Sequence, residues 1–330
     1  MASRFSTLRR RPRLAGDELD GRLGALERQV SELITMVGGV ASEQQRLLTW
    51  EAEVRTRVRR TQALTARAYE ALQRWPELIA AARADASYEL AYTDSEPLVS
   101  VPIPTYHSPD TLCDRALASV LAQTHGNWEA IVVGDHCTDD TEERVRAVGD
   151  PRIRFHNLSA REHDPADPWE RWAVKGSVPR STGIEMARGR WIAPLSHDDA
   201  WDPDHIATLL AAARERRAEI AYSRQRVVAA EQPGSPVIGT IGCFPPRYGD
   251  FGWQATIFNA ALGFLRYDRA CALASEPNDW NLARRAWEAG VRFHHVDRET
   301  VTLFEHHRQD QIRAELEAAG LPGSAAAGPS

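Results

Sequence analysis

The sequence is poor in the residues that build disulfide-rich, metal-clustered and membrane-spanning proteins. Only four of its 330 residues are cysteine, and Cys113, Cys137, Cys243 and Cys271 lie far apart. Without a CxxC pair, they predict neither a zinc cluster nor a disulfide framework. No run approaches the roughly 18 consecutive apolar residues that indicate a transmembrane helix.

The charge pattern also excludes several classes of protein. The formal net charge is -6, which gives no electrostatic signature of nucleic-acid binding, and Lys175 is the only lysine. The N-terminal residues are rich in arginine, but no apolar segment follows them, so they do not form a secretory signal. We therefore expect a cytoplasmic protein that binds no nucleic acid and contacts a membrane, if at all, only peripherally.

Short apolar runs alternate with helical patterns between residues 98 and 228. The runs Leu98–Pro104, Trp128–Val133 and Trp191–Leu195 predict buried strands, and helical patterns follow them after short connections. This alternation is typical of an α/β fold with a doubly wound, mostly parallel sheet flanked by helices. Ligands of such sheets bind at the carboxyl ends of the strands.

The N-terminal region has a different pattern, in which apolar residues recur with alternating spacings of four and three. The repeat comprises Leu19, Leu23, Leu26, Val30, Leu33, Val37 and Val40. It continues less regularly to Val58 and predicts a coiled coil at 19–58 that binds a partner or a second copy of the chain as a homodimer. The alternative is a helical hairpin folded back on the main domain. A second helical stretch at 63–84 contains Pro76, which is expected to kink or split it.

Acidic residues follow two of the predicted strands. Asp135 comes just after the second strand, and Asp198 and Asp199 come shortly after Trp191–Leu195. Two adjacent carboxylates at a sheet edge favour a hard divalent cation, Mg²⁺ or Mn²⁺, shared with substrate phosphates. The alternative is a helix N-cap, because aspartate is a common capping residue.

Several short motifs occur together in a fixed order within residues 97–308. They are VSVPIPTY at 99–106, ASVLAQT at 118–124, WEAIVVGD at 128–135, TDDT at 138–141, PRSTG at 179–183, ARG at 187–189 and HDD at 197–199. This ordered set resembles the family 2 glycosyltransferases of GT-A type. The resemblance does not extend to the N-terminal helices.

The resemblance implies a role for each matching residue in the donor site. Thr105 and Tyr106 would contact the nucleotide, and Asp135 would hydrogen-bond a pyrimidine ring. Arg180 would bind the diphosphate, with Arg171 as a looser candidate for the same role.

The resemblance also implies a metal site. Asp198 would hold the ribose or the metal, and Asp199 would ligate a Mn²⁺ or Mg²⁺ that bridges the diphosphate. His307 could complete the site, with a surface position as the alternative. The chain departs from the family at two places, since Gly134 and Ser196 stand where the family often has the first acid of each motif.

Asp279, in NDWNL at 278–282, matches a family acid at the start of a late helix. It would be the general base that deprotonates the acceptor. At a helix N-terminus its pKa is expected to be low, so that it is ionised and ready to accept a proton. A simple capping role is the alternative.

Taken together, the resemblance implies an inverting, metal-assisted glycosyltransferase that uses a nucleotide-sugar donor, with a UDP-sugar as first choice.

Residues 1–96 would form a helical extension, 97–230 the donor-binding half, 231–310 the acceptor-binding half and 311–330 a tail. The acceptor stays open among a saccharide, a lipid carrier, a small natural product and a peptide. A nucleotidyltransferase is the enzymatic alternative, since such enzymes also combine a doubly wound sheet with a metal. The second alternative is a non-catalytic GT-A-like scaffold that acts through the coiled coil. The absence of the family acids at Gly134 and Ser196 favours this alternative.

Overall fold

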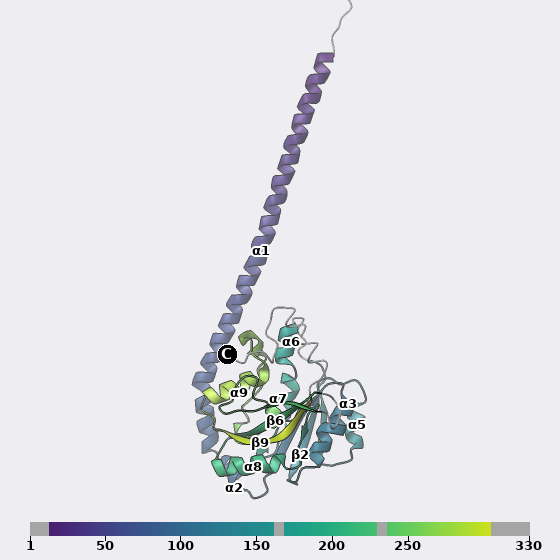
Figure 1. Cartoon of the computed structure of the whole chain (residues 1–330). Coiled ribbons are helices and arrows are strands. Elements are labelled where there is room, and N and C mark those ends of the chain that lie inside the picture. Colours follow the sequence, from purple (N-terminus) through teal and green to yellow (C-terminus); the bar gives the residue numbers. More distant parts are fainter. Residues whose placement is uncertain (1–12, 162–167, 230–235, 305–330) are drawn as a thin grey trace, which may run out of the picture. The chain divides into compact units, whose positions relative to one another are not determined.

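The computed structural model describes residues 13–161, 168–229 and 236–304 of the chain. It divides into two compact units, Met1–Gln62 and Ala63–Ser330, and helix α1 (Arg13–Ala84) contributes to both (Figure 1). The second unit therefore begins inside a helix, whereas the sequence pattern suggested a boundary at residue 97. The predicted tail at 311–330 lies outside the described residues. None of the helices in the described ranges has a stretch apolar enough to pass through a bilayer.

Helix α1 continues through Pro76, so of the two expected outcomes, a kink or a split, the split is wrong. Trp75 and Ile79 lie on either side of the proline and are only 6% and 2% exposed in the core of the second unit. One turn further on, Arg83 donates two hydrogen bonds to the buried carboxylate of Glu219, at 2.6 and 2.9 Å. These tertiary contacts stabilise the helix on both sides of a residue that would otherwise favour breaking it.

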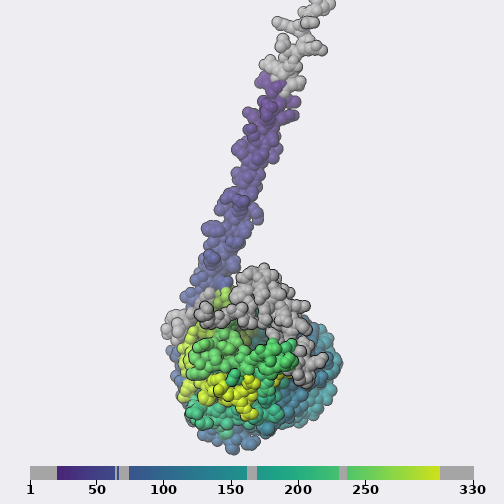
Figure 2. Space-filling model, in the orientation of Figure 1, coloured from purple at the N-terminus to yellow at the C-terminus, as the bar shows by residue number. Residues whose placement is uncertain are grey.

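The first unit has no core of its own in the part that the structure describes. The large apolar side chains of α1 that the structure describes in this unit are 39–69% exposed. They are Leu23, Leu26, Val30, Leu33, Ile34, Met36, Val37, Val40, Leu47, Leu48, Trp50, Val54 and Val58. Figure 2 draws this part of α1 as a single helix of atoms. The described residues of this unit therefore leave the seam of apolar residues uncovered.

The described residues of the second unit form a nine-stranded sheet. In spatial order the strands are β3 (Ile153–Asn157), β2 (Trp128–Gly134), β1 (Val99–Thr105), β4 (Trp191–Ile192), β8 (Thr256–Asn259), β6 (Ile220–Val228), β9 (Phe293–Phe304) and β5 (Ala200–Trp201), and β7 (Val237–Ile241) pairs with β6. Strands β1 to β4 run parallel, as do β6 and β9, whereas β5, β7 and β8 pair antiparallel with their neighbours. The predicted α/β class is confirmed, and the parallel half of the sheet is the half that carries the predicted donor site.

Helices pack on both faces of this sheet (Figure 1). The helices of the second unit are α2 (Ala86–Thr93), α5 (Thr141–Ala147), α6 (Pro168–Val174), α7 (Ser177–Glu185), α8 (His205–Arg216) and α9 (Asn278–Glu288), together with the continuous stretch α3 (Pro109–Thr111), π-helix η1 (Leu112–Leu117) and α4 (Ala118–Leu121). There are also short 3-10 turns, η2 (Trp253–Ala255), η3 (Ala260–Leu262) and η4 (Arg269–Ala274). Helix α6 packs against η4 in a small cluster of its own. In β6, Ala221 faces one core, while Ile220 and Tyr222 face the other. This alternation follows from the two-residue period of a strand.

Candidate active site

The carboxyl ends of β1, β2 and β4 meet at one edge of the sheet. Strand β1 lies between the other two and is parallel to both. The chain after β4 continues alongside β1, because the N–H groups of Ala193 and Leu195 donate to the carbonyls of Ser100 and Pro102 at 2.9 and 3.1 Å. The segments that leave these three strands carry the predicted residues Thr105, Tyr106, Asp135, Asp198 and Asp199. Such an edge is where open α/β sheets bind their ligands.

Tyr106, Asp135 and Arg161 lie together at the ends of β1 and β2. The guanidinium carbon of Arg161 is 4.2 Å from the centre of the Tyr106 ring, and its Nε donates to Asp135 Oδ2 at 3.3 Å. Tyr106 also stacks on His107, with ring centres 4.2 Å apart. The neighbouring Thr105 is only 2% exposed, and its Oγ1 has no hydrogen-bond partner among the described residues. An aromatic ring, a carboxylate, a guanidinium group and an unsatisfied hydroxyl can bind a nucleobase by stacking and hydrogen bonding.

Gly134, where the family often has its first acid, is packed too closely for a side chain. A Cβ atom at this position would lie 2.6 Å from Asn157 Oδ1 and 3.0 Å from the Phe155 ring. The Asn157 side chain accepts from the N–H of Cys137 at 2.9 Å and donates to its carbonyl at 2.7 Å. Asn157 therefore fixes the loop that follows Asp135, and the glycine gives it room to do so.

Asp198 and Asp199 are held in place by two residues that the sequence did not indicate. Arg115, from η1, donates from Nη1 to the Asp198 carbonyl at 2.8 Å and lies 3.8 Å over the Phe304 ring. The N–H of Phe304, at the end of β9, donates to Asp199 Oδ1 at 3.3 Å, and Asp199 is 4% exposed. Arg115 and Phe304 thus join the Asp-Asp segment to two distant parts of the chain.

The donor set at this segment suits a hard divalent cation, because both side chains supply carboxylate oxygens. The two aspartates would need further ligands, since the described residues contain no group of three or more His, Cys, Asp or Glu side chains that could hold a metal. Phosphate oxygens and water are the usual additional ligands of such ions. His307 lies outside the described residues, three positions after Phe304 in the chain.

Asp279 is the second residue of α9, and its surroundings change its acidity. Burial raises the pKa of Asp279, and three smaller effects lower it: the positive charge of Arg180, the N–H of Trp280, which donates to Asp279 Oδ1 at 2.6 Å, and the backbone N–H of Asp279 itself. The expected low pKa is therefore wrong in direction, because loss of hydration outweighs the helix N-terminus. A raised pKa makes the carboxylate a stronger base, which suits general-base chemistry near neutral pH. Trp253 holds its backbone by donating from Nε1 to the Asp279 carbonyl at 2.8 Å.

Arg180, on α7, is connected to the start of α9 through Asn278. Its Nη1 donates to Asn278 Oδ1 at 3.2 Å. The Asn278 side chain is nearly fully buried and also donates to Ser177 Oγ at 2.7 Å and to the Lys175 carbonyl at 3.0 Å. The structure thus brings Arg180 and Asp279 to one place, whereas Arg171 lies exposed on the separate helix α6.

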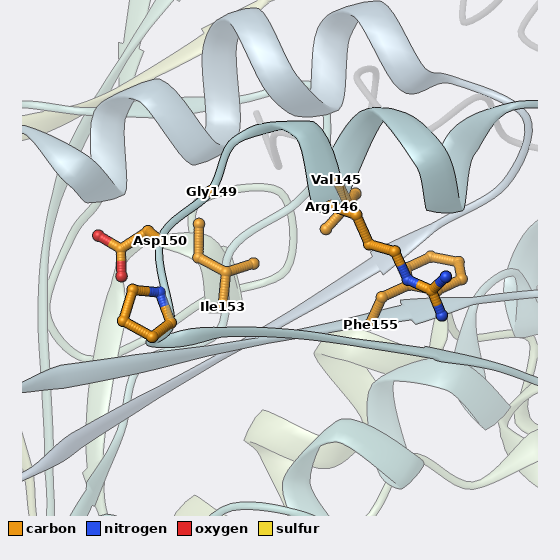
Figure 3. A pocket seen from close by; sticks show the side chains of 7 residues that line it. Val145, Arg146, Gly149, Asp150, Ile153 and Phe155 are labelled. Carbon is orange, nitrogen blue, oxygen red and sulfur yellow. The ribbon is translucent and has the colours of Figure 1, made fainter.

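An open hollow on the surface lies between α5 and β3 and is not part of this arrangement (Figure 3). It is lined by Val145, Arg146, Gly149, Asp150, Pro151, Ile153 and Phe155. None of the predicted site residues contributes to it. Its carboxylate, Asp150, already forms an ion pair with Arg152 at 2.7 Å.

Comparison with known proteins identifies the class to which this arrangement belongs. Residues 100–166 and 173–259 match the sequence model of glycosyl transferase family 2. The matched region belongs to this family, and the unit that contains it has the α/β fold that the motifs predicted.

Several characterised or named proteins are similar to parts of the chain. TuaG of Bacillus subtilis, named as a glycosyltransferase of teichuronic acid biosynthesis, is 32% identical over 145 residues, which are 44% of this chain and 52% of TuaG. The succinoglycan biosynthesis protein ExoO of Rhizobium meliloti is 36% identical over 138 residues, 42% of this chain and 36% of its own. WfgD of Escherichia coli, named as a UDP-Glc:alpha-D-GlcNAc-diphosphoundecaprenol beta-1,3-glucosyltransferase, is 29% identical over 132 residues, 40% of this chain and 47% of its own. This chain therefore spans about half or less of the length of these relatives.

Among solved structures, S. aureus TarS in complex with UDP-GlcNAc aligns with 66% of this chain and 66% of its own, at a TM-score of 0.49 and 16% sequence identity.

Proposed function

We propose that this chain is an enzyme that transfers a sugar from a nucleotide-sugar donor, a UDP-sugar first, to a saccharide acceptor with inversion at the anomeric carbon. Membership of family 2 supports the reaction class. The observation that carries the proposal is the sheet edge where β1, β2 and β4 end, because Tyr106 and Asp135 follow the first two strands and Asp198 and Asp199 lie in the segment after the third.

The nucleoside end of the donor would bind at Tyr106, Asp135 and Arg161. A pyrimidine can stack on the tyrosine ring and hydrogen-bond the carboxylate, and the unsatisfied Thr105 hydroxyl would gain a partner. Arg161 now covers the Tyr106 ring, so a base that stacks there would share or displace its guanidinium group. The name of WfgD, which specifies UDP-Glc as its donor, supports UDP as the first nucleotide to test.

The diphosphate would bind near Asp198, Asp199 and Arg180. A Mn²⁺ or Mg²⁺ ion held by Asp198 and Asp199, with His307 as a further candidate ligand, would neutralise charge on the departing diphosphate. Arg180 would add a fixed positive charge for the same purpose, and Arg171 stays a weaker candidate.

Asp279 would act as the general base. The acceptor hydroxyl attacks the anomeric carbon, its oxygen forms the new glycosidic bond, and the bond from that carbon to the diphosphate oxygen breaks. The hydroxyl proton passes to the Asp279 carboxylate. Because attack and departure occur on opposite faces of the sugar, a single displacement inverts the configuration. The raised pKa of Asp279 supports this role.

The names of the relatives favour a saccharide acceptor over a natural product or a peptide. TuaG and ExoO are named for the biosynthesis of polysaccharides, and the name of WfgD specifies a lipid-linked sugar as its acceptor. An acceptor on a lipid carrier would place the reaction of this chain at a membrane surface, where the enzyme would bind peripherally.

The test is a thermal-shift panel of UDP, GDP, dTDP and CDP, each with and without Mn²⁺, on the full chain. A ligand that binds only the folded state at about 100 times its Kd adds about 2.7 kcal/mol of stability. We expect a Mn²⁺-dependent rise in Tm with one nucleotide, UDP first.

Two variants and a control make the result specific. Asp135→Asn should weaken the shift with and without metal, and Asp199→Asn should remove mainly its Mn²⁺-dependent part. The control is Asp297→Asn, because Asp297 is an exposed acid that pairs with Arg224 at 3.1 Å. This variant should leave the nucleotide-induced rise in Tm unchanged. No shift with any nucleotide, in protein that unfolds cooperatively, would overturn the proposal and favour the non-catalytic alternative.

A further inference from the structure

We propose that residues 19–58 form a parallel, two-stranded coiled coil with the same residues of a second copy of this chain. The inference concerns only helix α1 within the first unit and is independent of the proposed reaction. It assigns an occupant to an apolar surface that the described residues of the first unit leave exposed.

The exposed side chains follow a heptad repeat, in which the positions are labelled a to g. The d positions are Leu19, Leu26, Leu33, Val40, Leu47 and Val54, and the a positions are Leu23, Val30, Val37, Gln44, Glu51 and Val58. The apolar a and d side chains whose surface the structure describes are 39–69% exposed. This seam is about 60 Å long at 1.5 Å per residue, and a partner helix of the same repeat can cover it. Four further exposed apolar residues lie beside it at e and g positions and widen the surface: Ile34, Met36, Leu48 and Trp50.

The residue types at the seam favour two strands. β-branched valine occupies the a positions 30, 37 and 58, with Leu23 at the first, and leucine occupies the d positions 19, 26, 33 and 47, with valine at 40 and 54. Valine at a with leucine at d is the combination that favours parallel dimers over trimers and tetramers.

The charges beside the seam favour a parallel, in-register pairing. Arg22 is a g position, and Glu27 is the e position of the next heptad. In a parallel dimer, Arg22 of one helix lies beside Glu27 of the other, and their charges are opposite. Within one helix the two residues are five positions apart, so they do not face each other there. Both side chains are exposed in the single chain. The pairing would form twice, once on each side of the dimer.

The glycines of this helix lie off the seam. Gly21, Gly24, Gly38 and Gly39 occupy positions f, b, b and c, and three of them have no atom within 4 Å of a Cβ built there. Glycine destabilises an isolated helix, so helix propensity alone gives little support to this segment. Packing of the seam against a partner would supply that stability without requiring side chains at the glycine positions.

Two polar a positions divide the seam into a stronger and a weaker part. Gln44 can hydrogen-bond its counterpart in an in-register dimer, as polar residues at single a positions do when they fix register. Glu51 would face its counterpart with a like charge, although Arg55 of the same helix forms an ion pair with it. Residues 19–40 therefore contribute most of the interface.

The first test is the molar mass of the full chain by light scattering after size-exclusion chromatography. We expect twice the chain mass of 36.8 kDa, and the single chain mass for the double variant Val30→Glu/Val37→Glu, which places four charges in the dimer seam. The matched control is Thr35→Glu/Ser42→Glu, which adds the same charges with the same spacing at the exposed f positions. It should stay dimeric. A circular-dichroism melt of each variant verifies that the second unit is folded.

The second test distinguishes parallel from antiparallel pairing. Leu33→Cys places a thiol at a d position, where its counterpart is adjacent only in a parallel, in-register dimer. Thr35→Cys is the control at position f. Under mild oxidation we expect a disulfide-linked dimer with Leu33→Cys, at least tenfold faster than with Thr35→Cys or with the native cysteines alone. A single-chain mass at tens of micromolar, a dimer that survives Val30→Glu/Val37→Glu, or equal cross-linking of the two thiols would overturn the proposal.

Discussion

Replacing Asp279 with asparagine should separate the chemistry of this residue from its effect on stability. The substitution preserves size and removes the charge. In the folded chain burial raises the pKa of Asp279 above its unfolded value of 3.8. Because the folded state disfavours the charged form, ionisation costs stability, and this cost develops as pH rises through 3.8 and is complete above the folded pKa. Each pKa unit corresponds to about 1.4 kcal/mol. Near pH 7 Asp279→Asn should therefore match or exceed the wild-type Tm, and the difference should vanish below pH 3.8.

Activity should move in the opposite direction. Loss of a general base costs about 10²- to 10⁴-fold in rate, which corresponds to about 2.7–5.5 kcal/mol of transition-state stabilisation. The assay is the release of nucleoside diphosphate from the donor identified by thermal shift. It is measured as kcat/KM at successive pH values from 8 down to the lowest pH at which the protein stays folded. Wild-type activity should fall as pH drops through the raised pKa of Asp279, and this acidic limb should be absent from the variant.

The control is Asp268→Asn, because Asp268 caps η4 by accepting from the N–H of Ala270 at 2.9 Å. This variant should lose a little stability and keep its activity. Our reasoning about Asp279 is refuted if its asparagine variant retains more than a tenth of wild-type kcat/KM. A loss of activity accompanied by a clear fall in Tm at pH 7 would instead indicate the capping role.

Three further predictions test the packing around the site. Gly134→Asp should abolish the nucleotide-induced rise in Tm because its Cβ would overlap Asn157, and adding Asn157→Gly should restore part of it; full binding by Gly134→Asp alone would contradict the steric argument. Arg115→Ala should remove mainly the Mn²⁺-dependent part of the rise, since the Asp198 carbonyl loses its donor, and an unchanged metal effect would exclude this positioning role. Trp75→Ala should lower the free energy of unfolding by about 3–5 kcal/mol in urea denaturation, and a loss below about 1 kcal/mol would show that α1 is not part of the core.

The strand ends of the donor site were predictable because a local pattern specifies them. The apolar run Trp128–Val133 was expected to form a strand, β2 covers Trp128–Gly134, and Asp135 follows it as expected. Each such motif consists of neighbouring residues, so its geometry depends little on distant parts of the chain. The roles that family resemblance assigns to these residues stay predictions.

The residues that support the site were not predictable, because they act across long separations. Arg161 reaches Asp135 from 26 residues away, and Arg115 reaches Asp198 from 83 residues away. An isolated arginine in a loop or a helix carries no local signal of such a contact. The raised pKa of Asp279 was missed for the same reason, since burial depends on the tertiary fold and not on position in the helix.

Gly134 shows that the absence of a family residue from the sequence can be mistaken for the loss of a functional site. From the sequence, the missing acid favoured a decayed site. In the structure the Asn157 side chain occupies the space that an acid at Gly134 would need, and it hydrogen-bonds the loop beyond Asp135. The departure from the family pattern is thus part of a consistent local packing.

The last turns of α1 determine where the chain can be shortened without unfolding the second unit. The family match begins at residue 100, yet Trp75 and Ile79 fill the core, and Tyr88 on α2 donates to Glu219 at 2.8 Å. A protein cut at the family boundary would expose apolar surface and leave the buried Glu219 carboxylate without two of its donors, which favours aggregation. The last turns of α1 therefore belong to the folded domain, and a shortened protein that keeps the fold must keep the chain from before Trp75 onward, although the family match begins at residue 100.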